Sequence, residues 1–223
     1  MIQKLIRLFA VCGFSYLTYK HCSHYHHFYW KSLWLMEGLL YFGFVFAYLF
    51  RKDPVSKASG LKEIILPLIC GVLPFFLMYE IPDISQVIHL LKQDPYSYQA
   101  YNSLLRYSPL IAPEFHVYAW FFLFVGTCIT VTALYTLRSS FSIMTEARVL
   151  VTRGIYSYIQ HPMYFGEYIA AFGSTLLRSS PQKWGIFCLF VVLQWIRLKN
   201  EEKKLTKVFT KYEDYKKNCW IRF

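Results

Sequence analysis

The sequence lacks the paired cysteines that disulfide frameworks and zinc sites need. Its six cysteines are scattered singly, and no C-x-x-C pair occurs. Most of them lie inside apolar stretches, where a free thiol behaves as a small hydrophobic side chain. We therefore expect buried free thiols, with neither a disulfide framework nor a zinc site.

Acidic residues are also scarce. The 223-residue chain has 13 Asp and Glu against 24 Lys and Arg, a net charge of +11, while 56% of its residues are hydrophobic and 20% aromatic. The positive residues lie beside apolar stretches and form no separate basic domain, so nucleic acid is not an expected partner. Basic loops of this kind are typical of a small polytopic membrane protein, and they attract anionic lipid headgroups.

The sequence shows no internal repeat, low-complexity segment or second domain. A small-x-small cleavage site is also missing after the short apolar run near Lys4 and Arg7, so we expect a retained first span rather than a cleaved signal peptide. The sequence therefore predicts a single membrane domain over residues 1–223.

Six apolar stretches come close to the roughly 20 residues that a helix needs to cross a bilayer. They predict an all-α, polytopic membrane helical bundle of five to six transmembrane helices, since the first stretch is short and contains Arg7. The last two stretches are joined by a short turn and predict a helical hairpin. The stretches span residues 5–19, 33–50, 64–79, 115–137, 163–177 and 184–196.

Two polar segments accompany these stretches. Residues 80–114 are rich in proline and tyrosine, and we expect short helices at the membrane interface there. The charged tail from Lys199 to Phe223 has Leu205, Val208 and Phe209 at helical spacing. This spacing predicts a cytoplasmic C-terminal amphipathic helix, either on the membrane surface or over the loop at 150–166.

Positive charge predicts the orientation of the chain. With six spans and the N-terminus inside, 18 of the 24 lysines and arginines lie in inside segments and 6 lie outside. This asymmetry favours a cytoplasmic N-terminus. It places the loop at 138–162 and the C-terminal tail on the same cytoplasmic face.

The polar, turn-rich loop at 150–166 is the first candidate for a binding site. Gly154 permits backbone angles that other residues avoid, and Pro162 disfavours a helical His161 while offering a pre-set first helical position. We therefore expect a loop-to-helix switch at His161–Pro162. The free N–H groups of the new helix would attract a carboxylate or phosphate. The alternative interpretation is an ordinary connecting loop.

The second candidate is the charged segment that follows the last apolar stretch. Arg197 and Glu201 are four residues apart and share one face of a helix. In a solvated tail they would form a surface ion pair that contributes at most about 1 kcal/mol. Where a helix leaves the bilayer, the same two residues could hold opposite charges of two ligands.

Two further features have competing interpretations. The histidines of segment 21–27 could form a metal site through His24 and His27, but interfacial histidines and aromatic residues that anchor the loop explain them better, and we expect no metal site. Glu167 is an acid in an apolar stretch, one turn after Pro162, and such acids normally face a protein interior or a polar cavity. It is therefore a candidate for contact with a ligand.

The motif V-L-V-T-R-G-I-Y-S-Y-I-Q-H-P-M-Y-F-G is followed by a short hairpin, R-x-x-x-E-E-x-x-L and a Tyr-x-x-Tyr tail. Over about residues 138–217 this pattern resembles the isoprenylcysteine carboxyl methyltransferase family. These are integral membrane enzymes that bind S-adenosylmethionine at the cytosolic face and take a lipid-like substrate from the bilayer.

The resemblance implies a division of work within the membrane domain. Residues 138–223 would form the cofactor-binding catalytic region, and residues 1–137 would supply the spans that shape the acceptor site. The implied activity is transfer of a methyl group from S-adenosylmethionine to a lipid or prenylated acceptor, most simply the carboxylate of a prenylcysteine-type substrate. No obligate protein partner is evident.

The resemblance also implies roles for individual residues. Arg197 and Glu201 would be catalytic, and Arg197 would bind the substrate together with Glu167. Two positions depart from the family pattern, with Gln160 where the family usually has arginine and Thr210 where it has glycine. The predicted cofactor contacts are Arg148, Val149, Leu150, Val151, Gly154, Tyr156, His161, Pro162, Met163, Tyr164, Glu201 and Glu202.

Other activities compete with this interpretation. Methylation of a phospholipid or another small lipid stays open within the same class. The Pro-x-Tyr-Phe-Gly-Glu run is similar to NADPH-dependent sterol and steroid reductases, which generally lack the R-x-x-x-E-E-x-x-L continuation. A third alternative is a non-catalytic relative that acts as a membrane interaction protein.

Overall fold

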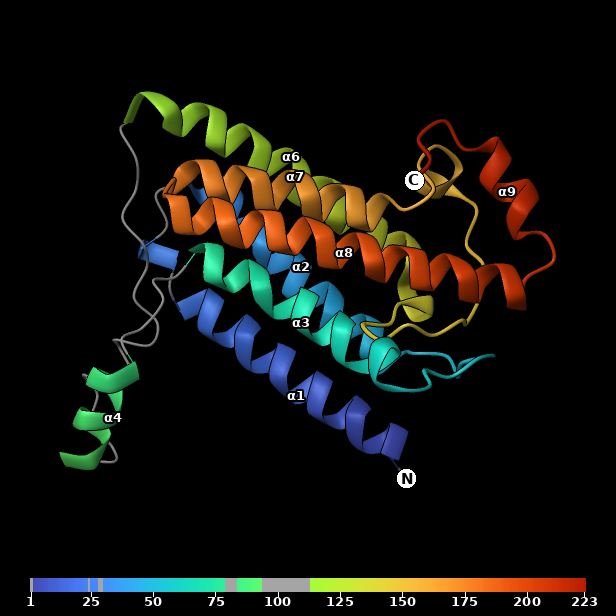
Figure 1. Cartoon of the computed structure of the whole chain (residues 1–223), viewed down its shortest axis with the longest axis horizontal. Helices are drawn as coiled ribbons and strands as arrows, with labels where there is room; N and C mark the ends of the chain where they lie inside the picture. Colours follow the sequence, from blue (N-terminus) through green and yellow to red (C-terminus); the bar gives the residue numbers. More distant parts are fainter. Residues whose placement is uncertain (1, 24, 28–29, 79–83, 94–112) are drawn as a thin grey trace.

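The computed structural model describes residues 2–23, 25–27, 30–78, 84–93 and 113–223, and these residues form an all-helical protein (Figure 1). The predicted all-α class is therefore confirmed for the described residues. Short 3-10 turns occur at Tyr25–His27, Pro113–Phe115, Arg138–Ser140 and Gly154–Ser157. The α-helices are α1 (Ile2–Ser23), α2 (Lys31–Leu49), α3 (Leu61–Met78), α4 (Ile84–Gln93), α6 (His116–Leu137), α7 (Pro162–Leu177), α8 (Pro181–Val208) and α9 (Tyr212–Asn218).

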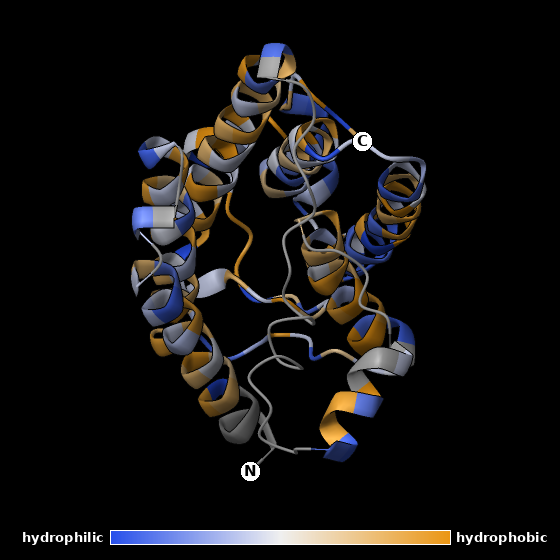
Figure 2. Cartoon of the chain, turned by 90° about the vertical axis from the view of Figure 1, so that its left-hand side faces the viewer, coloured by the Kyte–Doolittle hydropathy of each residue, from blue (hydrophilic) through white to orange (hydrophobic). Residues whose placement is uncertain are grey.

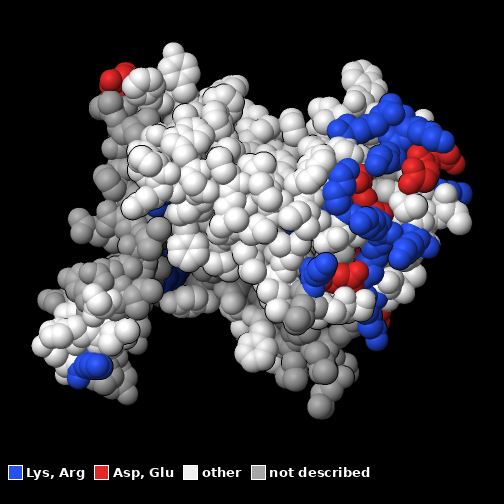
Figure 3. All heavy atoms as spheres, in the orientation of Figure 1, with Lys and Arg blue, Asp and Glu red and all other residues white. Residues whose placement is uncertain are grey.

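The six long helices lie side by side and alternate in direction along the chain (Figure 1). α6 packs against α2 and α7, α1 against α2, and α8 against α3. The alternation brings segments 51–60 and 138–161 and the C-terminal residues to one end of the bundle. Charged side chains gather at this end, where α9 lies, while the middle of the same face consists mainly of uncharged residues (Figure 3).

The outer surface of the bundle is apolar. Side chains such as Phe42 on α2, Phe121 on α6 and Val192 on α8 are exposed, and hydrophobic residues occur along all the long helices (Figure 2). Among the described residues, α2 and α6 are long and apolar enough to cross a membrane. These features indicate a membrane protein. The number of spans and the cytoplasmic orientation stay predictions.

Helices α6 and α7 approach each other closely because small residues line their contact. A Cβ atom on Gly166 would lie 2.7 Å from the backbone oxygen of Gly126. A Cβ atom on Gly173 would lie 2.5 Å from the backbone nitrogen of Leu123. Backbones therefore touch where side chains would normally separate them, as in other small-residue helix pairs of membrane proteins. This contact fixes the start of α7 against α6.

The helical hairpin is confirmed, but its second helix is longer than the sequence predicted. α8 continues from the apolar stretch through Val208, because the charged residues after Ile196 are good helix formers and include no glycine or proline. The prediction that the first part of the tail forms a separate amphipathic helix is therefore wrong. The separate helix is α9, and its Tyr212 contacts Gln160 in the loop at 150–166.

Several other expectations fall on described residues. All six cysteines are free, but only Cys70 and Cys219 are buried. The burial prediction is wrong for Cys12, Cys22 and Cys188, which are exposed on the apolar surface of the bundle. This surface accounts for the error, because an apolar stretch of a membrane helix need not face the protein core.

The histidine segment and the segment at 80–114 are described only in part. His24 and residues 79–83 and 94–112 lie outside the described residues, and α4 provides one short helix in the second segment. His21 is buried, with its Nε2 atom 2.7 Å from the backbone oxygen of Trp34. Within the described part of the chain, no group of three or more potential metal ligands occurs.

Candidate functional site

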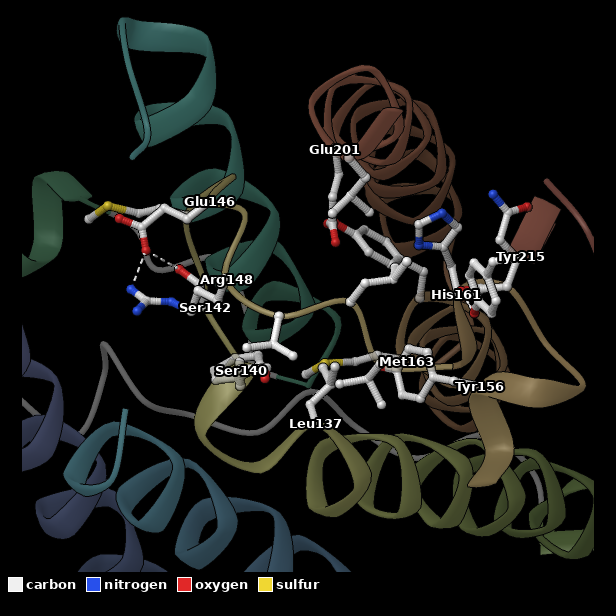
Figure 4. Close-up of a pocket in the computed structure, with 18 of the residues that line it drawn as sticks. Leu137, Ser140, Ser142, Glu146, Arg148, Tyr156, His161, Met163, Glu201 and Tyr215 are labelled. Carbon is white, nitrogen blue, oxygen red and sulfur yellow. Dashed lines mark hydrogen bonds and ion pairs between the residues drawn. The ribbon is translucent and has the colours of Figure 1, made fainter. Parts of the chain in front are cut away.

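A cavity of about 90 Å³ lies at the charged end of the bundle (Figure 4). Segment 137–151 forms one wall, the loop at 156–161 and the first turn of α7 form another, and α8 and α9 contribute the rest. Ten of the residues predicted from the sequence line this cavity. They are Arg148, Val149, Leu150, Val151, Tyr156, His161, Met163, Tyr164, Arg197 and Glu201.

The start of α7 has the predicted geometry. His161 has φ −130° and ψ 68°, outside the helical region, and Pro162 is the first helical residue. The loop-to-helix switch is therefore confirmed. Gly154 has φ +61°, the left-handed region that favours glycine, and a Cβ atom there would lie 3.3 Å from Thr136. Gly154 thus shapes the loop without lining the cavity.

Arg197 projects from α8 into the cavity wall. Its guanidinium donates to Gln194 Oε1 at 3.3 Å and to the backbone oxygen of Ile143 at 3.0 Å. It also lies over the ring of Tyr164, 5.0 Å from the ring centre. In the described structure these two acceptors occupy only two of the five N–H donors of an arginine. The remaining donors are available to an anionic ligand.

Glu201 follows Arg197 by one helical turn and lines the same cavity. It accepts a hydrogen bond from the hydroxyl of Tyr164, which is buried at the start of α7. α8 therefore presents a cation and an anion to the first turn of α7. The two side chains line the same cavity, as expected for residues that share one helix face.

Glu146 and Arg148 lie across the cavity from Glu201 and His161 (Figure 4). Glu146 forms ion pairs with Arg148 and with Arg51, which follows α2. Burial would raise the pKa of Glu146, but the two arginines and a hydrogen bond from Ser142 outweigh it and lower the pKa below its ordinary value. The ionised cluster ties the cavity wall to the end of α2, which places the Arg148 guanidinium in a structural contact.

Gln160 is the most informative departure from the family pattern. Its side chain is 2% exposed, and its Nε2 atom donates to Glu202 and to the hydroxyl of Tyr212, 3.0 Å away. Its Oε1 atom accepts from the backbone nitrogen of Phe223 at 3.1 Å. Gln160 therefore connects the loop to α8, to α9 and to the C-terminal residues, a role that its position in the motif did not reveal.

Glu202 lies beside Gln160 and does not line the cavity. It accepts hydrogen bonds from Lys199 at 2.9 Å and from Lys216 at 3.0 Å. Burial would raise the pKa of Glu202, but hydrogen bonds from His161, both lysines and Gln160 outweigh it and hold the pKa well below its ordinary value. Ionised Glu202 holds α8, α9 and the loop together, which differs from the predicted direct contact with the cofactor.

Glu167 lies on α7, one helical turn beyond Met163. It accepts a hydrogen bond from Gln194, and Gln194 in turn accepts from Arg197. Like Gly154, Pro162 and Glu202, it does not line the cavity. The predicted contact of Glu167 with a substrate therefore stays a prediction, and its connection to Arg197 passes through Gln194.

Sequence reasoning missed about half of the cavity wall. Tyr215 belongs to the Tyr-x-x-Tyr pattern of the tail, which was a usable signal. Glu146 and its neighbours have no local motif, because they join the wall through contacts with residues distant in the sequence, such as Arg51 and Arg197. The missed residues are Leu137, Ser140, Phe141, Ser142, Met144, Glu146, Gln160, Leu205 and Tyr215.

Comparison with known proteins bears on this site directly. Residues 115–212 match the phospholipid methyltransferase family. The protein-S-isoprenylcysteine O-methyltransferase of Dictyostelium discoideum is 34% identical over 106 residues, which cover 43% of this chain and 43% of that protein. The enzyme of the same name from Saccharomyces cerevisiae is 34% identical over 97 residues, with 40% of each chain covered. That from Mus musculus is 28% identical over 100 residues, covering 41% and 35%.

The chain thus spans less than half the length of the curated relatives it matches. The matched residues include the loop at 150–161, the start of α7, Arg197 and Glu201. These matches confirm the resemblance seen in the motifs: residues 115–212 of this chain are similar to methyltransferase enzymes.

Proposed function

We propose that this chain transfers a methyl group from S-adenosylmethionine to a lipid-like acceptor that enters from the bilayer, and that the accepting group is the carboxylate of a prenylcysteine-type molecule. One observation carries the proposal. Arg197 and Glu201 of α8 meet the motif residues of 148–164 at a single cavity, within the part of the chain that matches the methyltransferase family. The apolar spans before residue 138 would shape the acceptor site.

The chemistry of the cavity wall fits the methyl donor. S-adenosylmethionine supplies, when bound, an activated methyl group on a positively charged sulfur, so that transfer requires neither a metal nor a covalent enzyme intermediate. The free N–H groups at the start of α7 would bind its carboxylate. Glu201 would accept hydrogen bonds from its ammonium or ribose hydroxyls. Apolar side chains such as Leu150, Val151 and Met163 would cover the base.

The acceptor would be held by Arg197. A carboxylate is ionised at neutral pH and needs no general base. The planar guanidinium can bind both of its oxygens. Tyr164 and Gln194 fix the orientation of Arg197, so these residues would align the acceptor and exclude water, which is how positioning contributes to rate.

Donor binding provides the first test. The detergent-solubilised protein is expected to bind radiolabelled S-adenosylmethionine and to transfer its methyl group to an S-prenylcysteine acceptor. Labelled NADPH serves as the comparison, because the reductase alternative requires it. If the protein binds NADPH and does not bind S-adenosylmethionine, the result would contradict the proposal and favour a reductase. Binding of neither would favour a non-catalytic membrane protein.

Methylation of a phospholipid amine is the second candidate function, and two observations favour it. The matched family has the phospholipid methyltransferase name, and Glu167 provides a carboxylate that is connected to Arg197 through Gln194. An ammonium acceptor must lose a proton before it can attack a methyl group. Glu167 could accept that proton, whereas a carboxylate acceptor requires no such base.

Replacing Glu167 with glutamine separates the two acceptors. We expect carboxylate methylation to change by less than about tenfold, because the role of Glu167 near Arg197 is indirect, whereas loss of a general base typically reduces a rate by roughly 10²–10⁴-fold. Transfer of labelled methyl groups to S-prenylcysteine and to phosphatidylethanolamine would be measured side by side. A loss of 100-fold or more, confined to the phospholipid acceptor of an active wild-type protein, would favour the second candidate.

A further inference from the structure

A second cavity of about 760 Å³ lies beside the first, between the loop and the last two helices. The two cavities share two wall residues, Leu150 and Tyr215. Val208 and Phe209 also line the second cavity, and the remaining wall residues, here called its rim, are polar: Thr152, Ser157, Thr210, Lys211, Asp214 and Asn218. It therefore forms at the charged end of the bundle, on the side away from the apolar spans.

Of the two cavities, only the second has a volume that is typical of a pocket for a nucleoside-sized ligand. Pockets for such ligands typically enclose roughly 300–1,000 Å³. The first cavity, at about 90 Å³, is below this range, and the second, at about 760 Å³, lies within it. Leu150 and Tyr215 line both cavities, so a nucleoside that passes from the second cavity toward Arg197 and Glu201 has to displace one of them.

The contacts of α9 show how this wall is held. The hydroxyl of Tyr215 donates to the backbone oxygen of Gln160 at 3.1 Å. The hydroxyl of Tyr212 contacts the Gln160 side chain at 3.0 Å. Beyond α9, the backbone nitrogen of Gln160 donates to Ile221 at 3.0 Å. Tyr212 also contacts His161 at 3.2 Å, and Lys216 pairs with Glu202 of α8 at 3.0 Å. The Tyr215 hydroxyl itself is held to the loop by its hydrogen bond to Gln160.

We propose that the second cavity is the access vestibule for the water-soluble, nucleoside-type methyl donor, and that Tyr215 on α9 is the wall that moves to admit it. This inference rests on the proposed function and extends it with a route. The donor carries ammonium and carboxylate groups, which suit a rim that contains Asp214 and Lys211. The lipid-like acceptor would approach through the apolar spans, so the two substrates would enter from different sides.

Obstruction of the vestibule tests the route. Asn218→Trp places a large ring at the vestibule rim, on a residue that does not line the first cavity. S-adenosylhomocysteine serves as the probe, and its association and dissociation rates would be measured by rapid mixing with full-length protein in detergent. We expect both rates to fall at least about fivefold with Kd within about twofold, because an obstruction on the path affects both directions equally.

Two further variants complete the experiment. Thr210→Trp obstructs the rim from the turn between α8 and α9 and should give the same result if Asn218→Trp does not fold. Lys217→Trp is the matched control, because Lys217 lies next to Asn218, is 73% exposed and does not line the vestibule. Its rates should equal those of the wild type.

The outcomes distinguish the route from the function. Unchanged association and dissociation in folded Asn218→Trp or Thr210→Trp would overturn the vestibule while leaving the methyltransferase proposal intact. An equal slowing in Lys217→Trp would also overturn it, since the effect would then not depend on the cavity. Failure of the wild-type protein to bind S-adenosylhomocysteine or S-adenosylmethionine would instead overturn the proposed function, and the vestibule with it.

Discussion

Replacing Arg197 with alanine is expected to reduce methyl transfer by at least about 100-fold. One hydrogen bond to a charged group contributes roughly 3 kcal/mol at most, and about 1.4 kcal/mol corresponds to a tenfold change in rate. Loss of a single such bond to the acceptor therefore explains two orders of magnitude. The rate would be measured as transfer of a labelled methyl group to S-prenylcysteine at saturating S-adenosylmethionine.

A lysine at the same position is expected to restore little of this loss. Lysine retains the positive charge, but it lacks the planar guanidinium that contacts Gln194 and the Ile143 backbone while lying over Tyr164. A compact ammonium cannot maintain this arrangement and bind both oxygens of a carboxylate. The acceptor KM should therefore rise in Arg197→Lys, while the affinity for S-adenosylmethionine stays close to that of the wild type.

Two comparisons make the Arg197 result specific. Lys203→Ala removes one positive charge from the same helix at an exposed position, and it should leave methyl transfer unchanged. Glu201→Ala should instead weaken donor binding, because Glu201 faces the donor side of the cavity in the proposed arrangement. Wild-type activity in both Arg197→Ala and Glu201→Ala would exclude this site as the place of catalysis.

Replacing Gly166 with alanine is expected to destabilise the protein by about 2–3 kcal/mol, in the upper part of the range for inserting a methyl group into a well-packed contact. The new Cβ atom would lie 2.7 Å from the backbone oxygen of Gly126. A backbone carbonyl in a helix cannot move aside as a flexible side chain can. α6 and α7 would have to separate, and Tyr164 would move with α7.

The measurement is thermal unfolding of the purified protein in detergent, together with methyl transfer below the unfolding temperature. Gly185→Ala is the matched control, because a Cβ atom at this position of α8 meets nothing within 4 Å. It should cause no loss of stability. Equal unfolding temperatures for the wild type and Gly166→Ala would show that the close contact of α6 and α7 does not contribute to stability.

The two predictions concern different contributions of the same region. Gly166 lies two residues after Tyr164, and the hydroxyl of Tyr164 donates to Glu201. The Gly166→Ala substitution should therefore lower both the unfolding temperature and the rate of methyl transfer. The Arg197→Ala substitution should reduce methyl transfer, and it should lower the unfolding temperature only by the small amount that the lost contacts with Gln194 and Ile143 contribute. Comparing the change in unfolding temperature with the change in methyl-transfer rate therefore distinguishes a packing defect from a defect in the reaction.

Local patterns were sufficient for several features of this protein. Apolar stretches predicted the helical class because membrane helices need long apolar runs. Pro162 predicted the start of α7 because its fixed backbone angle suits a first helical position. The four-residue spacing of Arg197 and Glu201 predicted a shared helix face. Each of these inferences depends on residues that are close together in the sequence.

Other features could not be obtained in this way. The tail after Ile196 was misassigned because propensity alone does not reveal where a long helix stops, and α8 continues through Val208. Glu202 was predicted to contact the cofactor, and that contact stays a prediction; the structure shows Glu202 paired with Lys199 of α8 and Lys216 of α9. Too many cysteines were predicted to be buried, because an apolar stretch does not reveal which side of its helix faces the protein core and which faces lipid.

The sequence by itself determined the helical class, the loop-to-helix switch and the residue types of the candidate site. Only the tertiary structure decided how the site is closed. Arg51 reaches Glu146 across 95 positions of the chain, and Gln160 reaches Glu202 across 42. Such contacts depend on how the helices pack, and that packing is set by close backbone approaches such as the one at Gly166. Local sequence patterns do not predict which distant residues come into contact, so the role of Gln160 could be found only in the folded chain.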